Sequence, residues 1–282
     1  MLWSQLKRKR NNEIMTPACP ICTSSKYRTI SEDLLLCTRC CIIYNTNHAP
    51  AVYSTDYFGQ EYKQQYGKTY EDDFESIYAV SLSRLSIIKK YLGDNLSAKS
   101  LLDIGCALGF FCKAARDVGF GEVEGLEISE YAARYSRHKY NIPVHSTGFE
   151  DFIPVKKYDA ITAWFVLEHF NDPYAMFVKI YEMLEDNGIF ACTLPSYFGP
   201  LFYCHRSQWV RSHPQDHRID VAPKSIKKLL QQIGFSYVRC FPSGYHPERF
   251  GTIAQKYKKL YNFIARLLCF SDTILVIALK KA

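Results

Sequence analysis

The sequence predicts an α/β protein with a doubly wound, mostly parallel seven-stranded sheet (a Rossmann-like fold) after a small cysteine-rich, zinc-ribbon-like module. From Leu101 onwards, short apolar runs alternate with amphipathic segments, which is the order of strands and helices in a parallel sheet. A glycine-containing turn follows the first of these runs, and two CxxC pairs lie near the N-terminus. The 282 residues suffice for one large domain and such an appendage.

The composition is that of an ordinary globular protein, with 48% hydrophobic and 22% charged residues. The longest apolar candidate for a membrane span, Phe263 to Leu279, contains Arg266 and Asp272. Residues 1–15 are basic but lack the apolar stretch of a secretory signal. We therefore expect a disordered basic tail over 1–15, no transmembrane helix and a cytoplasmic location with reduced cysteines.

The two cysteine pairs, Cys19-Pro-Ile-Cys22 and Cys37-Thr-Arg-Cys40, have the spacing of a metal site. Thiolates two residues apart on a tight turn can bind one ion at about 2.3 Å, and a second pair completes a tetrahedron. Because sulfur fills all four positions, we expect a structural Zn²⁺ rather than a catalytic one. Cys41 could replace Cys40, and chance pairs of buried or redox-active cysteines are the alternative interpretation.

The zinc module, predicted over 16–48, is expected to be a structural cap. Zinc ribbons often contact nucleic acid, but Lys26, Arg28 and Arg39 are too few for a track of phosphate contacts. The net charge of +7 permits an anionic partner without requiring one. A nucleic-acid partner is therefore not expected.

An aromatic-rich linker with lid helices is predicted over 49–98. Its tyrosines and phenylalanines follow no steady period up to residue 78, and they either pack between the modules or form a lid over a ligand pocket. A helix should follow and end at Gly93. Its apolar positions with the period of a helix are Val80, Leu85, Ile88 and Leu92.

The remaining chain, 99–282, is predicted to be a single domain. Helices are expected between its strands, with Ser129 and Asp172 as N-caps and Gly119, Gly188 and Gly234 as stops. The expected strands are Leu101–Ile104, Val123–Ile128, Ile142–Val144, Tyr158–Phe165, Ile189–Leu194, Ser236–Phe241 and Thr273–Leu279.

The turn after the first strand is the leading candidate for a cofactor site. Gly105 and Gly109 let the backbone approach a ligand at a helix N-terminus. Glu127 ends the second strand, where a carboxylate can accept both hydroxyls of a ribose. A nicotinamide-binding domain is the rival, but the turn reads GxxxG rather than GxGxxG. In addition, Asp103 would repel a pyrophosphate and attract an ammonium.

The chain resembles class I S-adenosylmethionine-dependent methyltransferases through three motifs. More narrowly, it is similar to bacterial members with an N-terminal four-cysteine module, many of which methylate sugars, polysaccharides or other small molecules. The likeness covers roughly Ser81 to the C-terminus, and Ala107 departs from it because the family pattern has a third glycine there. The motifs are Leu102-Asp-Ile-Gly-Cys-Ala-Leu-Gly109, Gly125-Leu-Glu-Ile128 and Val166-Leu-Glu-His-Phe-Asn-Asp-Pro173.

This resemblance implies S-adenosylmethionine as the cofactor and assigns residues to it. Asp103 corresponds to the residue near the methionine ammonium, Glu127 to the ribose-binding acid and Trp164 to a residue beside the methionyl group. Phe149 and Glu150 fall where the adenine is flanked. The implied cofactor-binding set is Asp103, Gly105, Cys106, Gly109, Glu127, Ile128, Phe149, Glu150 and Trp164.

Methyl transfer from a sulfonium mainly requires alignment of an acceptor and exclusion of water, and a hydroxyl acceptor also requires a base. His169 after the fourth strand and His217 in a polar insertion are the candidate catalytic residues, ahead of His205 and His213. The alternatives are core packing or capping for His169 and a surface loop for His217. Aromatic residues of the insertion could line an acceptor site or pack the loop, namely Tyr197, Phe198, Phe202, Tyr203 and Trp209.

Three functional classes follow from these patterns. The first is methylation of a small molecule, such as a sugar, a glycan intermediate or a polysaccharide precursor. The second is methylation of RNA or protein, held by the zinc module and the basic C-terminal region, which strongly salt-dependent RNA binding would favour. The third is a non-catalytic protein that binds S-adenosylmethionine.

Overall fold

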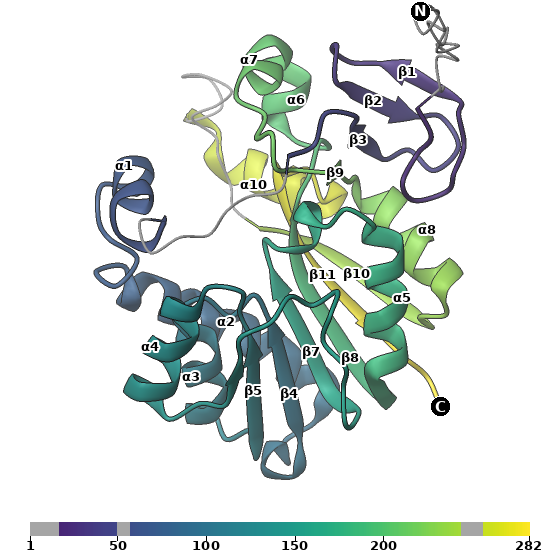
Figure 1. Ribbon diagram of the computed structural model, residues 1–282. Coiled ribbons are helices and arrows are strands. Elements are labelled where there is room, and N and C mark those ends of the chain that lie inside the picture. The colour runs from purple at the N-terminus through teal and green to yellow at the C-terminus, as the bar shows by residue number, and fades with distance from the viewer. Residues whose placement is uncertain (1–16, 50–56, 244–255) are drawn as a thin grey trace, which may run out of the picture.

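The computed structural model describes residues 17–49, 57–243 and 256–282 (Figure 1). The basic tail predicted over 1–15 lies outside these ranges, as does part of the aromatic-rich linker. Within them, no helix combines the length and the hydropathy needed to cross a membrane.

A seven-stranded, mostly parallel sheet organises the chain, as the sequence predicts. The strand order is β10-β11-β8-β7-β4-β5-β6, and β11 runs antiparallel to both of its neighbours. Central strands are continuous apolar runs because helices cover both faces of the sheet. The strands are β4 (Ser100–Ile104), β5 (Glu122–Leu126), β6 (Val144–His145), β7 (Tyr158–Trp164), β8 (Leu184–Pro195), β10 (Tyr237–Pro242) and β11 (Thr273–Leu279).

Each face of the sheet has its own hydrophobic core. Leu85, Ile88 and Phe111 are buried on the face covered by α2, α3 and α4. Phe177 and Ile226 are buried on the opposite face, below α5 and α8. In Figure 1 the first group of helices lies to the left of the sheet and the second to the right. The helices are α2 (Phe74–Leu92), α3 (Phe110–Asp117), α4 (Glu130–Tyr140), α5 (Pro173–Met183) and α8 (Pro223–Ile233).

Most of the predicted helix ends are confirmed. The side chain of Ser129 accepts a hydrogen bond from the backbone N–H of Ala132, and Asp172 accepts one from Ala175 at 2.9 Å. Gly93 and Gly234 are the C-cap residues of α2 and α8. These ends could be predicted because capping depends on local chemistry.

Two predictions about helices are wrong. Gly188 does not end α5, which already ends at Met183, because Leu184 adopts an extended conformation and begins β8. Val80 does not belong to the buried face of α2, since its side chain is 48% exposed and Ser81 is buried instead. A small polar residue at a buried position hides the true face of a helix from a hydrophobicity pattern.

The cysteine-rich module forms a second, four-stranded sheet that includes a strand from far along the chain. Its strands pair in the order β1-β2-β3-β9, and β9 comes from the insertion between β8 and α8. This pairing is antiparallel, with Ile43 opposite Asp220 and Tyr44 opposite Ile219. The strands are β1 (Tyr27–Thr29), β2 (Leu34–Cys37), β3 (Ile43–Asn45) and β9 (Ile219–Asp220).

Four further α-helices lie in the described part of the chain. Lid helices are predicted within 49–98, but the sequence patterns give the bounds of none of these four. Two lie in the insertion between β8 and α8, one in the aromatic-rich linker and one between β10 and β11. They are α1 (Tyr62–Tyr66), α6 (Pro200–Cys204), α7 (Arg206–Arg211) and α10 (Lys258–Leu268).

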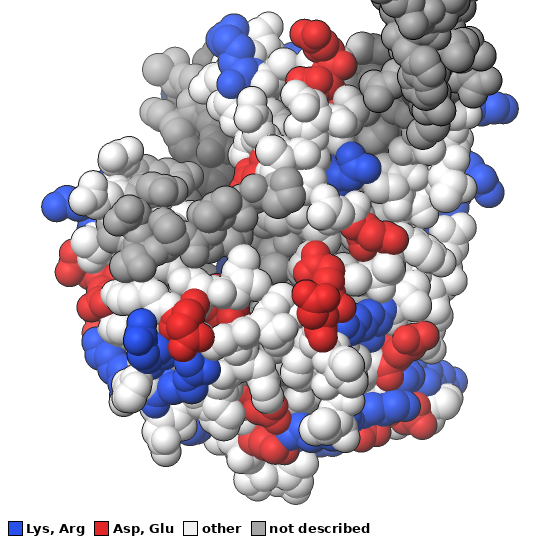
Figure 2. All heavy atoms as spheres, in the orientation of Figure 1, with Lys and Arg blue, Asp and Glu red and all other residues white. Residues whose placement is uncertain are grey.

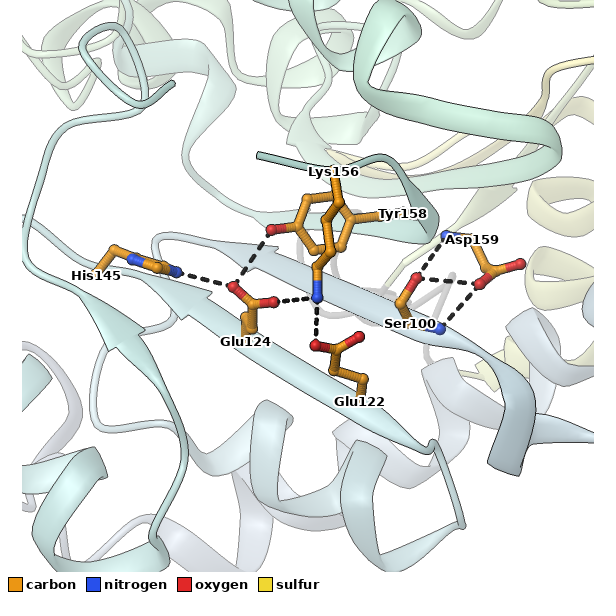
Figure 3. Close-up of polar contacts among 7 residues, drawn as sticks. All are labelled: Ser100, Glu122, Glu124, His145, Lys156, Tyr158 and Asp159. Carbon is orange, nitrogen blue, oxygen red and sulfur yellow. Dashed lines mark hydrogen bonds and ion pairs between the residues drawn. The ribbon is translucent and has the colours of Figure 1, made fainter. Parts of the chain in front are cut away.

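Polar contacts connect β5 to β6 and β7 near the starts of the long strands (Figure 3). Lys156 contacts the carboxylates of both Glu122 and Glu124, and the Tyr158 hydroxyl donates to Glu124 at 3.3 Å. The Nε2 atom of His145 lies 2.8 Å from Glu124 Oε2. Burial alone would raise the pKa of Glu124, but the hydrogen bonds from His145 and Lys156 outweigh it and lower this pKa. This network supports the sheet away from the edge where the strands end.

Candidate functional site

The turn between β4 and α3 places glycines where the backbone conformation and the packing both require them. Gly105 and Gly109 have φ angles of +70° and +78°. A Cβ atom at Gly105 would lie 2.5 Å from the side chain of Val166, and one at Gly109 would lie 2.0 Å from Ser136 Oγ. Ala107 also has a positive φ, of 48°, so the departure from the family pattern costs backbone strain.

Glu127 follows β5 and presents a fixed carboxylate to this turn. Its Oε2 atom accepts the backbone N–H of Ala107 at 2.9 Å, and its Oε1 atom accepts that of Ser129 at 2.8 Å. The residue is 6% exposed, and burial raises the pKa of its carboxyl group. Each oxygen has capacity for a further hydrogen bond, so the pair can accept two neighbouring hydroxyl groups.

Asp103 lies one residue before the end of β4, beside β7, and is almost fully buried. Its Oδ1 atom accepts a hydrogen bond of 2.6 Å from the hydroxyl of Thr162, and Cys112 Sγ lies 3.8 Å from Oδ2. Burial raises the pKa of Asp103 to about 7, whereas the hydrogen bond from Thr162 and the charge of Arg84 act in the opposite direction. A cationic ligand group beside Asp103 would stabilise its ionised form.

Arg84 of α2 was not predicted as a site residue. Its guanidinium lies 4.2 Å from the ring centroid of Trp164, whose ring packs 4.9 Å from that of Phe111. Burial lowers the pKa of Arg84 to about 10, while Asp103 raises it. No carboxylate of the described chain lies within 4.0 Å of the guanidinium. Nothing in the sequence distinguishes Arg84 from a solvent-exposed arginine on a helix.

The residues expected around an adenine occupy different environments. Ile128 is 54% exposed, whereas Cys106 and Phe149 are buried. Glu150 is exposed, and Lys179 Nζ holds this loop by donating to the carbonyls of Phe149 at 2.7 Å and Glu150 at 3.0 Å. Their contacts with a nucleoside stay predictions.

The aromatic-rich linker covers the glycine turn. Phe58 is buried against the start of α3, and the backbone N–H of Tyr70 donates to its carbonyl at 3.0 Å. The ring of Tyr70 lies 5.4 Å from that of Phe110. Burial raises the pKa of Tyr70 well above its usual range, and the charges of Asp103 and Glu127 add to this effect. The linker is therefore packed over the same edge that carries these two acids.

His169 and His217 lie together although they are far apart in the sequence. Their ring centroids are 5.0 Å apart. The Nδ1 atom of His169 lies 3.0 Å from the carbonyl oxygen of Asp216 and 3.2 Å from its carboxylate. Burial lowers the pKa of His217 to about 4. For His169, burial lowers the pKa, but Asp216 and Glu168 outweigh it and the net direction is upwards.

Three further polar residues lie beside these histidines, namely Glu168, His213 and Asp220. The sequence predicts His213 as a weaker catalytic candidate and neither of the two acids. Glu168 is fully buried, and burial raises its pKa to about 7. His213 Nε2 lies 2.7 Å from Asp220 Oδ2. Of the other candidates, His205 is exposed at the start of α7. Glu168 lies within the third resemblance motif, which was the one available signal for it.

The aromatic residues of the insertion mostly pack the loop instead of lining an open pocket. Tyr197, Phe202 and Trp209 are buried in a cluster with Leu34 and Ile43 of the cysteine module. Two others, Phe198 and Tyr203, are only partly covered or exposed.

The four predicted cysteines converge on one point. Sγ atoms of Cys19 and Cys40 are 3.5 Å apart, as are those of Cys22 and Cys37, and all four lie within 4.8 Å of one another. The contact with Cys40 lowers the pKa of Cys19 to about 5. Cys41 is exposed and does not belong to the cluster. A set of four converging sulfur atoms fits Zn²⁺.

Comparisons with known proteins agree with this fold. A protein family described as a methyltransferase domain matches residues 78–239. Ubiquinone biosynthesis O-methyltransferase of Proteus mirabilis is 26% identical over 125 residues, which cover 42% of this chain and 50% of that protein. The Bordetella avium enzyme of the same name is 26% identical over 207 residues, or 66% of this chain and 80% of that one. The chain thus spans only half the length of the first of these relatives.

Solved structures share the architecture at low sequence identity. A SAM-dependent methyltransferase from Archaeoglobus fulgidus has a TM-score of 0.57 at 17% identity, over 78% of this chain and 98% of that one. Magnesium protoporphyrin IX methyltransferase from Synechocystis PCC 6803, solved with bound SAH, has a TM-score of 0.52 at 15% identity, over 80% and 97%. The family match covers more than half of the sequence, and the chain therefore belongs to the methyltransferase domain family with the class I S-adenosylmethionine-dependent fold.

Proposed function

We propose that this protein transfers the methyl group of S-adenosylmethionine to a small-molecule acceptor. The observation that carries the proposal is the carboxylate of Glu127, fixed by the N–H groups of Ala107 and Ser129 at the edge where β4 and β5 end. Asp103 and Arg84 lie at the same edge. Together these side chains offer acceptors for ribose hydroxyls, an anion for the ammonium and a cation for the carboxylate of the cofactor.

Other residues around this edge have separate roles in the proposed reaction. When bound, the sulfonium supplies an activated methyl carbon, whose bond to sulfur breaks with the electron pair staying on sulfur as the acceptor atom attacks. Trp164 and the linker containing Phe58 and Tyr70 exclude water. His169, oriented by Asp216, accepts the proton of an acceptor hydroxyl. His217 provides a second basic nitrogen beside it.

Oxygen is the proposed acceptor atom. The relatives named above are O-methyltransferases by name, and a hydroxyl acceptor gives the histidines a chemical role. A sugar or glycan intermediate and a phenolic metabolite both present such a hydroxyl. Incubating the protein with labelled S-adenosylmethionine and a small-molecule extract, followed by mass spectrometry of the labelled product, identifies the acceptor.

Calorimetric titration with S-adenosylmethionine tests the cofactor site. Glu127→Ala is expected to abolish measurable binding, because both ribose hydroxyls lose their acceptor. Glu122→Ala, at the other end of β5, is the matched control and should bind as the wild type does. Circular dichroism of both variants checks that the fold is intact. Normal binding by Glu127→Ala would exclude this site.

We also propose that the four cysteines hold a structural Zn²⁺ ion. Support comes from their converging sulfur atoms and from the eleven free thiols of the chain, which suit a reducing compartment such as the cytoplasm. Zinc should be measurable by elemental analysis and should be lost from this module in Cys37→Ser. Retention of all bound zinc by Cys37→Ser would contradict the assignment.

A macromolecular acceptor has less support. Figure 2 shows acidic and basic side chains interspersed over the face that it draws, without a continuous basic track among the described residues of that face. RNA binding depends on such tracks, and its affinity falls steeply with salt. Gel-shift measurements at low and high salt would reveal it.

A further inference from the structure

A second group of candidate metal ligands lies apart from the cysteines, where η3 (Leu167–His169) meets the insertion before α8. Ligand atoms of Glu168, His169 and His217 all lie within 4.8 Å of one another. His213, His217 and Asp220 form a second candidate group, which shares His217 with the first. The two segments are held together by the N–H of residue 218, which donates to the carbonyl of Glu168.

Glu168 is the observation that points to a bound cation. Its side chain is 0% exposed, and neither carboxylate oxygen has a hydrogen-bond partner in the described part of the chain. A buried carboxylate without partners loses its hydration and gains nothing in return. Protonation would remove the charge, but neither oxygen has a hydrogen-bond partner in the described structure. Buried Nδ1 of His217 likewise has no partner among the residues described.

His169 is oriented as metal-binding imidazoles usually are. Its Nδ1 atom is held by the carbonyl and the carboxylate of Asp216, at 3.0 and 3.2 Å. Contacts of this kind fix the orientation of many metal-binding histidine rings. The loop that carries His217 also carries His213, and their ring centroids are 5.7 Å apart. The Nε2 atom of His213 contacts the carboxylate of Asp220.

We propose that Glu168, His169 and His217 bind a divalent transition-metal ion such as Zn²⁺. Two imidazoles and one carboxylate suit Zn²⁺ or Fe²⁺, whereas Mg²⁺ and Ca²⁺ prefer oxygen ligands throughout. Three protein ligands also leave one coordination position open, which the four cysteines do not.

The open coordination position would let the ion take part in methyl transfer, so this role of the ion rests on the proposed function. An acceptor hydroxyl bound there would have its pKa lowered by the ion and would lose its proton more readily. His169 would then be a ligand to the ion and not the proton acceptor. Metal binding itself does not depend on this role and can be tested without any acceptor.

Counting ions with Co²⁺ as the probe separates the two metal sites. The full-length protein is stripped with a chelator and refilled with Co²⁺, and wild type is expected to bind about two ions per chain. Cys37→Ser should lose one ion together with the absorption of thiolate-to-cobalt charge transfer. Glu168→Gln and His217→Asn should each lose one ion and keep that absorption. His138→Asn, at a histidine on the surface of α4, is the matched control and should bind two.

Thermal unfolding supplies a second measurement. Glu168→Gln removes an unpartnered buried charge, so without an ion its Tm should equal or exceed that of wild type. Zn²⁺ should then raise the Tm of wild type more than that of Glu168→Gln, because only wild type has both sites. The proposal fails if wild type binds only one ion and Cys37→Ser loses it, if Glu168→Gln and His217→Asn bind as many ions as wild type, or if the two Tm increases are equal.

Titration with S-adenosylmethionine on the same samples keeps this inference separate from the proposed function. Wild type that binds two ions but no S-adenosylmethionine would retain this site and lose the proposed function. Wild type that binds S-adenosylmethionine but only the cysteine-bound ion would retain the proposed function and exclude this second site.

Discussion

Two residues at the edge of the sheet adopt a backbone conformation that side chains disfavour. Phe165, directly after β7, has a φ of 58° and a 44% exposed side chain, and Ala107 in the glycine turn has a φ of 48°. The left-handed conformation costs a residue with a side chain about 1–2 kcal/mol. Strain of this kind is often found where a side chain has a function. Phe165 lies next to Trp164, so we expect its ring to contact the acceptor.

The variant Phe165→Gly is expected to trade activity for stability. Glycine relieves the strain, partly offset by its own entropy in the unfolded state, so the free energy of unfolding should rise by up to about 1 kcal/mol. Turnover of the acceptor identified by labelling should fall because its contact with the ring is lost. Ala107→Gly is the control. Its free energy of unfolding, measured by urea denaturation, should rise by a similar amount, and its turnover should stay unchanged. Unchanged turnover in Phe165→Gly would assign the ring to packing.

Asp103 should make cofactor binding depend on pH. Its carboxyl group has a pKa of about 7 in the folded protein and is therefore neutral in acid. Because an ammonium favours the ionised form, S-adenosylmethionine affinity should rise from pH 5.5 to 7, by at most about tenfold per pH unit, and then level off. Asp103→Asn should bind weakly with no such rise in calorimetry. A parallel rise in Asp103→Asn would assign the effect to another group.

The raised pKa of Asp103 also determines how the stability of the folded protein depends on pH. Between pH 3.8, the ordinary pKa of an aspartate, and about pH 7, the folded protein keeps a proton on Asp103 that the unfolded chain has released. The contribution of Asp103 to stability therefore falls as the pH rises through this window. Asp103→Asn should gain stability relative to wild type over the same range.

At the level of elements, the sequence predicts most long, periodic segments and misses short ones, although it also misses α10, which has 11 residues. β11 is predicted with its observed ends, and α8 ends at Gly234 as expected. β9 has two residues and α6 has five, which is too short for any period to be visible. β9 exists because β3 offers it an edge, and that edge comes from a segment more than 170 residues earlier.

The pairing of β9 with β3 should make the loop before β9 depend on the cysteine module. Backbone and side-chain contacts tie Asn45 and His48 to residues 215–218, next to His213 and His217. Cys37→Ser should therefore accelerate hydrogen–deuterium exchange over 212–221 while exchange over β4 stays at the wild-type rate. Ser substitution at the exposed Cys204 is the control. If exchange over 212–221 is equally fast in Cys37→Ser and in wild type, the loop is held in place without the module.

For the whole molecule, the cysteine module and the large sheet share a hydrophobic core. Cys19, Ile42 and Tyr44 of the module belong to the same buried cluster as Phe177 and Ile226. We expect one cooperative unfolding transition, because neither part can separate without exposing this shared surface. Tryptophan fluorescence and thiol accessibility should report the same urea midpoint, which Cys37→Ser should shift to lower urea for both probes. Separate midpoints in wild type would indicate independent domains.

The sequence by itself determined the alternation of strands and helices, the glycine turn, Asp103 and Glu127 at two strand ends, and the four cysteines. All of these depend on periodicity or spacing within a short stretch of chain. Only the tertiary structure brought Arg84 to Trp164 and joined Glu168, His169 and His217, whose significance arises from burial and from partners distant in sequence. Burial removes water from a charged group, and no local pattern records where that happens.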